Sequence, residues 1–532
     1  MNKIKKLVVW LSFSSRSSAL LAFIAAFLTC IGANAYCWGN ALFSHDSLMI
    51  DQSIDVQHNY AIGRFLVPAL CMLRGWWASP VIVGVGGALL LSFSIALIVW
   101  FLSIRKRFVI ILFAALLSLN SCIILINATY INFFDSMMMS LLCSVLAFGF
   151  WKKEGLLSGI CAVFCLIGTF ALYQVYVEVY LTLLVLYIVQ KCVNESSLIG
   201  LARKVLKSLL ILIVSFLFYI ALWKLVLEVS GVTLSDASNS LGSIGLLSAE
   251  EAIKTLVTAY CRPFLFLLQP ATHFMILCGV INFGSLIVGF VGVVILACRS
   301  RFKSKFRIAL VVVCLLLLPL ASDCLSLVST SLFHGLMIWP WFLLCYVPAA
   351  LVLNDLQPDF ASRTTLDSSL ITVALTCFMG IILIGSNWVY GNRVYFEKEL
   401  QAQATLSVAT RIVDRIETIP GYKPGETPVV IIGDINNNPY FKGRWSTSVP
   451  VSPLINRFGI DKCYAVGFVN SFGFTYVESF KNYANYILHT PINIIGIPST
   501  NKMDLGSSFE KDPFPSEESI FLCDGVVVVV LS

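Results

Sequence analysis

Charged side chains are scarce in this chain of 532 residues. Only 12% of the residues are Asp, Glu, Lys or Arg and 58% are apolar, whereas soluble domains carry roughly 25% charged residues. This composition excludes an ordinary soluble protein. The chain also lacks a Cys-x-x-Cys pair, a histidine cluster and an internal repeat of fixed period. The sequence therefore predicts no metal site, no redox centre and no repeat architecture.

Long apolar segments account for this composition. A helix needs about 20 mostly apolar residues to cross a hydrocarbon layer about 30 Å thick. Eleven segments reach or approach this length and predict an all-α polytopic membrane domain. Their residues are 17–36, 80–102, 108–127, 135–151, 156–172, 175–189, 209–227, 274–297, 308–327, 336–353 and 370–385.

Basic residues are distributed unevenly between the loops. Alternate loops, beginning with the N-terminal segment, hold 19 Lys and Arg residues, and the opposite loops before residue 386 hold five. Because cytoplasmic loops are enriched in Lys and Arg, we expect a cytoplasmic N-terminus and a C-terminal tail on the other side. The net charge of +7 then reflects topology and predicts no nucleic-acid partner. The alternative for residues 1–38 is a cleaved signal peptide, but we expect an uncleaved first helix.

The composition changes after residue 385, where the chain becomes polar and rich in Pro and Asn. We therefore expect two domains, a transmembrane domain at 1–386 with a first external loop at 37–79, and a small external α/β domain at 387–532. Helical spacing at 393–419 and 472–488, an apolar strand at 428–432 and a strand pair at 519–531 that turns at Asp524-Gly525 support the second domain. Its two cysteines, Cys463 and Cys523, are either a disulfide or two separate buried thiols.

Carboxylates gather on the first external loop, where Asp46, Asp51 and Asp55 fall within ten residues. Carboxylates at a membrane surface are costly and need either a partner or a task. Further acids on the same face are Asp135, Glu178 and Asp323, and the cations that face them are Arg64, Arg74, Lys224 and Arg262.

Such a cluster suits a transferase, because a carboxylate can deprotonate a hydroxyl while guanidinium groups neutralise a departing phosphate. We expect Asp46 to be the catalytic base. For Asp51 and Asp55, salt bridges and helix caps are an equally good explanation. No Asp-x-Asp ligand set is present on this face, so we expect catalysis without a metal or other cofactor.

A second polar group, formed by Tyr173, Gln174 and Glu178, lies at the same membrane interface. A hydroxyl, an amide and a carboxylate together are suited to hydrogen-bonding a sugar. An ordinary aromatic belt is the alternative, but it explains only the tyrosine.

Several short motifs, in this order, resemble those of the phage-type, serotype-converting O-antigen glucosyltransferases. They are His45-Asp46-Ser47 after the first helix, Gly63-Arg64-Phe65, Tyr173-Gln174, PVVIIG at 428–433 and DGVVVVVLS at 524–532. That family is similar to the wider GT-C class of multi-span transferases. Members often have two adjacent acids where this chain has His45 and Asp46, so Asp46 is the single matching carboxylate.

The resemblance implies a GT-C-like membrane domain of about eleven helices with a periplasmic C-terminal domain, in a bacterial inner membrane. The implied reaction moves glucose from undecaprenyl-phosphate-glucose to a sugar of the lipid-linked O-antigen unit on the periplasmic side. A flippase and a polyprenyl-phosphate glucosyltransferase are the implied partners. From their charge and placement together with this resemblance, we expect Asp46, Asp51 and Asp55 as the catalytic residues. The expected substrate-binding residues are His45, Arg64, Arg74, Asp135, Tyr173, Gln174, Glu178 and Arg262.

Two other classes of membrane protein remain as alternatives. A flippase or transporter of polyprenyl-linked sugars is expected to have broken helices with charges near the bilayer midplane, whereas the acids here lie at one face. An O-antigen polymerase or ligase is expected to carry a large external loop between late spans. This chain instead places its soluble mass at the C-terminus, which favours the glucosyltransferase.

Overall fold

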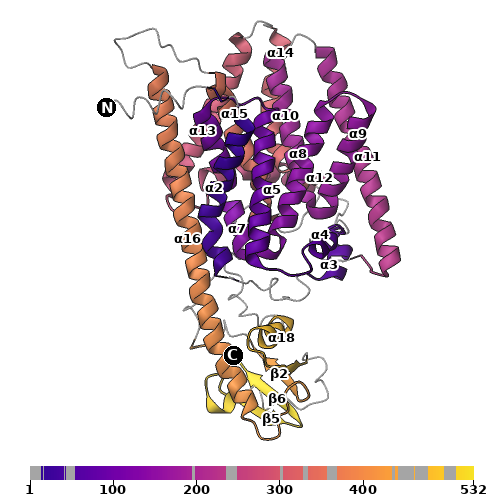
Figure 1. Ribbon diagram of the computed structural model, residues 1–532, viewed down its shortest axis with the longest axis vertical. Coiled ribbons are helices and arrows are strands. Elements are labelled where there is room, and N and C mark those ends of the chain that lie inside the picture. The colour runs from indigo at the N-terminus through magenta and orange to yellow at the C-terminus, as the bar shows by residue number, and fades with distance from the viewer. Residues whose placement is uncertain are drawn as a thin grey trace.

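The computed structural model consists of a bundle of long helices with a small sheet domain at one end (Figure 1). The structure describes residues 14–15, 17–40, 42, 54–194, 198–234, 249–299, 304–327, 333–355, 368–433, 438–440, 460–461, 477–495 and 511–532. The helices of the bundle are α2 (Ser18–Gly39), α5 (Pro80–Phe101), α6 (Arg107–Ser118), α7 (Ser121–Thr129), α8 (Phe134–Lys152), α9 (Leu156–Tyr173), α10 (Val177–Asn194), α11 (Leu198–Ser230), α12 (Ala249–Leu268), α13 (Met275–Arg299), α14 (Lys305–Ser322), α15 (Trp339–Asp355) and α16 (Ser368–Glu417).

Nine helical stretches in the described part of the chain are long and apolar enough to cross a membrane. The predicted number was eleven. One stretch of 38 residues, Leu156–Val193, comprises two helices, α9 and α10, and helix α15 has only 17 residues. Each of the eleven predicted segments thus coincides with helix, but the count of eleven crossings stays a prediction.

Two polar interruptions shape the bundle. The third predicted segment is split into α6 and α7 at Asn120, whose side chain caps α7 by accepting a hydrogen bond from the backbone N–H of Ile123 at 3.2 Å. A 3-10 turn, Gln174–Tyr176, separates α9 from α10. At both breaks a side chain with hydrogen-bonding capacity, Asn120 or Gln174, lies where the regular α-helix ends.

The two ends of the bundle differ. The short helices α3 (Val56–Ala61) and α4 (Val67–Leu73) follow α2 and lie at the end that also faces the C-terminal domain (Figure 1). At the other end, the backbone N–H of Ser15 donates to the carbonyl of Arg105 in the basic connection between α5 and α6. Helices α3 and α4 and the C-terminal domain are therefore on one side of the bundle, and Ser14 and Ser15 are on the other.

Helix α16 joins the bundle to the C-terminal domain. It runs for 50 residues, through the predicted boundary at residue 386. Its last turns carry Val408, Ile412 and Ile416, which pack in the core of the C-terminal domain. A single rigid element therefore belongs to both parts (Figure 1).

The C-terminal domain contains a four-stranded sheet in the order β4-β2-β6-β5. Strands β2 (Pro428–Ile432) and β6 (Val526–Val530) are parallel, and Val429 pairs with Val527. Strand β4 (Asn493–Ile494) is parallel to β2, and β5 (Ile520–Cys523) is antiparallel to β6. Helix α18 (Val477–Tyr486) contributes Phe480 and Tyr483 to the core on one face. The predicted strands at 428–432 and 519–531 are confirmed.

Two further observations concern this domain. A short parallel pair joins β1 (Phe333–His334), before α15, to β3 (Ile460–Asp461). Cys523 is a free, half-buried thiol, and Cys463, with which a disulfide or two separate thiols were equally open, lies outside the described residues.

Candidate active site

The structure describes eight of the eleven predicted site residues, and they lie at or near the end of the bundle that carries α3 and α4 (Figure 1). His45, Asp46 and Asp51 lie outside the described residues. The eight are Asp55, Arg64, Arg74, Asp135, Tyr173, Gln174, Glu178 and Arg262.

Asp55 is the N-cap of helix α3. Its Oδ1 accepts a hydrogen bond from the backbone N–H of His58 at 2.9 Å. This contact satisfies one of the N–H groups that the first turn of a helix leaves without an intrahelical partner. One carboxylate oxygen of Asp55 therefore has a structural task, and a catalytic role for this exposed residue stays a prediction.

Arg64 follows helix α3 and stacks on an aromatic ring. Its guanidinium carbon lies 4.7 Å from the centre of the Tyr173 ring, within the range of a cation–π contact. The Nε atom is buried without a hydrogen-bond partner among the described residues, and none of their carboxylates pairs with it. The contact fixes the guanidinium but leaves its charge uncompensated there.

The turn that carries Arg64 packs directly on helix α11. Gly63 has φ +82°, and a Cβ at this position would lie 2.2 Å from the Tyr219 hydroxyl oxygen. The Tyr219 hydroxyl donates to the Gly63 carbonyl at 3.2 Å, and the Gln174 amide donates to the Ile62 carbonyl at 3.0 Å. Trp223 donates to the Tyr60 carbonyl at 2.7 Å. Only glycine fits both the backbone conformation and the close approach.

Arg74 and Asp135 form an ion pair, with 2.7 Å between Nη1 and Oδ2. Arg74 also donates to the Asn132 carbonyl at 2.9 Å. Their side chains are 8% and 20% exposed, so this pair is largely shielded from solvent. It fixes the C-terminal end of α4 to the start of α8, and the Arg74 charge is already balanced by a carboxylate.

A second polar cluster is buried where α10, α12 and the end of α14 meet. Arg262 lies 3.7 Å from Asp323 and donates to the Ser326 hydroxyl at 2.8 Å. Glu178 accepts from the backbone N–H of Leu325 at 2.9 Å. Its other oxygen, Oε2, is buried without a hydrogen-bond partner among the described residues.

Asp323 follows the last residue of α14 and is fully buried. Burial raises the pKa of this carboxyl, and the neighbouring Arg262 guanidinium opposes the rise. Glu178 lies close enough to interact with the same two charges. Two buried carboxylates thus share one guanidinium, so Arg262, like Arg74, faces protein acids.

The two polar groups are connected through the turn between α9 and α10. Tyr173 ends α9, Gln174 begins the turn, and Glu178 lies in the first turn of α10. The rings of Tyr173 and Tyr176 are 5.6 Å apart. The structure thus divides the predicted group: Tyr173 and Gln174 contact the turn that carries Arg64, whereas Glu178 lies in the cluster of Asp323 and Arg262.

Helix α16 brings a buried lysine to the same end of the bundle. Lys398 is 1% exposed, and its ammonium group donates to the Ala128 carbonyl at the end of α7. Cys37, in the last turn of α2, is close enough to interact with it electrostatically. Lys398 was not among the predicted site residues, because it follows the predicted domain boundary at residue 386.

Comparison with known families gives a match to the family described as "Glucosyl transferase GtrII" over residues 35–347. The chain belongs to the GtrII glucosyltransferase family. The predicted resemblance to the serotype-converting glucosyltransferases is thereby confirmed at the level of the family. Comparisons with curated proteins and with solved structures find no match.

The extent of the GtrII match is informative about the site. It includes all eleven predicted site residues and Asp323, and it ends in helix α15. Helix α16, with Lys398, and the C-terminal sheet lie beyond it. The part of the chain that matches the GtrII family thus contains both polar groups described above, and membership of the family implies a glucosyltransferase.

Proposed function

We propose that this GtrII protein transfers glucose from undecaprenyl-phosphate-glucose to a sugar hydroxyl of the lipid-linked O-antigen unit, at the periplasmic face of a bacterial inner membrane. The observation that carries the proposal is the state of Arg64. It is a guanidinium at one end of a membrane bundle, stacked on Tyr173 and without a described carboxylate partner.

The charges of the other candidate cations support this assignment. Arg74 and Arg262 each face a carboxylate at 2.7 Å and 3.7 Å, so adding a phosphate there would require a rearrangement. Arg64 can instead donate hydrogen bonds to a phosphate oxygen without losing an ion pair to a described carboxylate, and guanidinium groups bind phosphates well. Arg64 is therefore the residue proposed to hold the donor phosphate and to stabilise it as it leaves.

The remaining roles follow from the chemistry of glucosyl transfer. The acceptor hydroxyl must lose a proton as it attacks the anomeric carbon, and a carboxylate near the phosphate site can accept it. We assign this role to Asp46, with Asp51 and Asp55 as supporting acids and His45 as a substrate contact. Gln174 and Glu178 are assigned to sugar hydroxyls, and Arg74, Asp135 and Arg262 to shaping the site.

The location of the lipid-linked substrates explains why a polytopic protein is used. The polyprenyl chain stays in the bilayer while the sugar phosphate lies at the interface, so the transferase has to meet it at the membrane surface. Such a donor must be made by a polyprenyl-phosphate glucosyltransferase and moved across the membrane by a flippase. We propose that these two activities supply the enzyme.

The test is donor preference in membranes that contain the protein and the lipid-linked O-antigen acceptor. Radiolabelled glucose is supplied either as undecaprenyl-phosphate-glucose or as a nucleotide sugar, in membranes that lack the polyprenyl-phosphate glucosyltransferase. We expect label in the O-antigen only with the lipid-linked donor. Labelling from the nucleotide sugar alone would overturn the proposal.

A further inference from the structure

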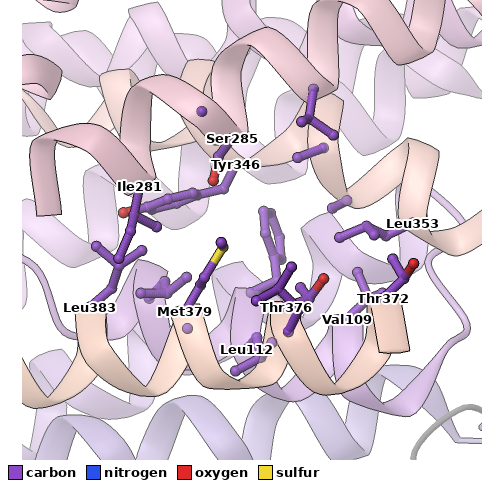
Figure 2. Close-up of a pocket in the computed structure, with 18 of the residues that line it drawn as sticks. Val109, Leu112, Ile281, Ser285, Tyr346, Leu353, Thr372, Thr376, Met379 and Leu383 are labelled. Atoms are coloured by element: carbon purple, nitrogen blue, oxygen red, sulfur yellow. The ribbon is translucent and has the colours of Figure 1, made fainter. Parts of the chain in front are cut away.

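A cavity of about 440 Å³ lies between helices α6, α13, α15 and α16. Figure 2 shows side chains from these helices converging on one space, among them Leu112, Ile281, Tyr346 and Met379. Apart from Tyr346, the polar groups on its wall are the hydroxyls of Ser285, Thr372 and Thr376, and no charged residue lines it. The cavity can therefore hold a hydrocarbon but not a charged head group.

The cavity is open on one side. Its lining residues Val280, Val288 and Leu375 are 66%, 54% and 50% exposed, whereas Phe113 and Ala350 on the inner wall are 3% and 4% exposed. All of the exposed residues belong to helices that are apolar enough to cross a membrane. In the bilayer this opening faces lipid, so the cavity is a groove that a chain can enter sideways from the membrane.

The groove lies in the half of the bundle far from the candidate active site. Val109 is two residues after the start of α6 at Arg107, in the basic connection, and Thr372 is near the start of α16. At 1.5 Å per residue, Leu383 at the other end of the groove is about 22 Å along α16 from Lys398. One leaflet of a bilayer is about 15 Å thick, so only a longer chain reaches the groove from the active-site end.

We propose that this groove binds the isoprenoid chain of a lipid-linked sugar substrate whose head group lies at the active-site end. The inference rests on the proposed function, in which both substrates carry such chains. An unfilled apolar cavity costs free energy in proportion to its volume, and water finds too few partners there. Hydrocarbon therefore fills the groove, and a chain longer than one leaflet connects it to the site.

Gly284 provides a way to fill the groove without disturbing its wall. It lines the groove, and a Cβ built on it meets nothing within 4 Å. Gly86, in helix α5, also has no neighbour within 4 Å but does not line the groove. Gly284→Phe and Gly86→Phe are therefore matched variants that differ in whether the new ring occupies the groove.

The experiment measures retention of undecaprenyl phosphate by native mass spectrometry of the full-length protein in nanodiscs of phosphatidylglycerol and phosphatidylethanolamine. We expect Gly284→Phe to reduce retention about tenfold or more, and Gly86→Phe to leave it unchanged. Equal retention by Gly284→Phe and wild type would overturn the proposal. So would a groove that keeps phosphatidylglycerol and does not exchange it for undecaprenyl phosphate.

A crosslinking measurement covers the case in which Gly284→Phe does not fold. A photoreactive benzoylphenylalanine replaces Leu375, which lines the groove, or Phe378, which is 62% exposed on the same helix but does not line it. We expect position 375, and not 378, to crosslink to undecaprenyl phosphate. Equal crosslinking at both positions would overturn the proposal that the groove binds the isoprenoid chain. Neither readout needs turnover. If the protein binds the lipid in the groove but transfers no glucose, the proposed function is wrong and the proposed lipid site still holds.

Discussion

The Arg64 guanidinium differs from the neighbouring cations in what its charge faces. Arg74 and Arg262 face carboxylates, whereas Arg64 faces the Tyr173 ring and keeps a buried Nε without a described partner. A buried donor without an acceptor is costly. A substrate phosphate would satisfy it, which gives a physical reason for the residue to remain in this state.

Arg64→Ala should raise KM for the lipid-linked donor and lower kcat/KM about 10-fold to 100-fold, since a hydrogen bond to a charged group contributes about 1.5–3 kcal/mol. Arg64→Lys should restore part of the loss, because an ammonium keeps the charge but not the fork of donors. Donor-dependence of initial rates measures this. Lys224→Ala, an exposed cation on α11, is the control and should change little; equal losses in both variants would contradict the assignment.

Asp323 gives a second prediction, which concerns pH. Burial raises the pKa of its carboxyl, so the folded protein keeps a proton that the unfolded chain releases above about pH 4. The free energy of unfolding should therefore fall as the pH rises from about 4 toward the raised pKa of Asp323. Glu178 and Arg262 are the charged groups that face Asp323 over this range.

In Asp323→Asn this contribution is absent, so the fall in stability over the same pH range should be smaller. Thermal unfolding of the detergent-purified protein, followed by tryptophan fluorescence at several pH values, measures the difference. Parallel pH profiles for wild type and Asp323→Asn would show that Asp323 is not the group responsible.

At the scale of elements, the turn between α3 and α4 is held by helix α11. The hydroxyl of Tyr219 donates to the Gly63 carbonyl in this turn, and the indole of Trp223 donates to the Tyr60 carbonyl in the last turn of α3. Arg64 directly follows Gly63. The position of the proposed phosphate contact is thus set by a helix more than 100 residues later in the chain.

Gly63→Ala should displace this turn for two reasons. The new methyl group would lie 2.2 Å from the Tyr219 oxygen, and alanine is strained at φ +82°. Gly231→Ala, at φ +67° with nothing within 4 Å, has the strain alone, about 1–2 kcal/mol. Thermal unfolding and donor KM should both change more for Gly63→Ala. Equal effects of the two substitutions would exclude the contact as the cause.

At the scale of the whole molecule, helices α3 and α4 lie at the end of the bundle that faces the C-terminal domain, and Ser15 contacts Arg105 at the other end (Figure 1). With the positive-inside rule, this arrangement supports our proposal that the C-terminal domain is periplasmic. Alkaline phosphatase fused after Ser532 should therefore be active in intact cells, and the same enzyme fused after Lys153, between α8 and α9, should be inactive. The reverse pattern would invert the topology.

The apolar helices and the C-terminal strands were predictable because each depends on a local pattern. Helix α5 and the strands β2, β5 and β6 lie within two residues of their predicted bounds. The continuity of α16 was not predictable, since its composition changes from apolar to polar while the helix continues. The cap at Asn120 was hidden within an apolar run.

The sequence suggested candidate residues for the site but not how they are arranged. Facing acids and bases along one membrane surface indicated Arg64, Arg74, Asp135 and Arg262. Their partners and positions depend on contacts between distant segments of the chain. The turn before Arg64, for example, is held by Tyr219, which contacts Gly63 from 156 positions away. A hydroxyl and an indole inside an apolar span were the signals that could have pointed to Tyr219 and Trp223.

The central claim is that this membrane bundle performs base-assisted glucosyl transfer from a polyprenyl phosphate. The most direct measurement is the single-turnover rate of transfer from undecaprenyl-phosphate-glucose to lipid-linked O-antigen in proteoliposomes, for wild type and Asp46→Asn. The account predicts that Asp46→Asn retains donor binding and loses turnover by roughly 100-fold or more. An Asp46→Asn protein that transfers glucose at the wild-type rate would contradict it.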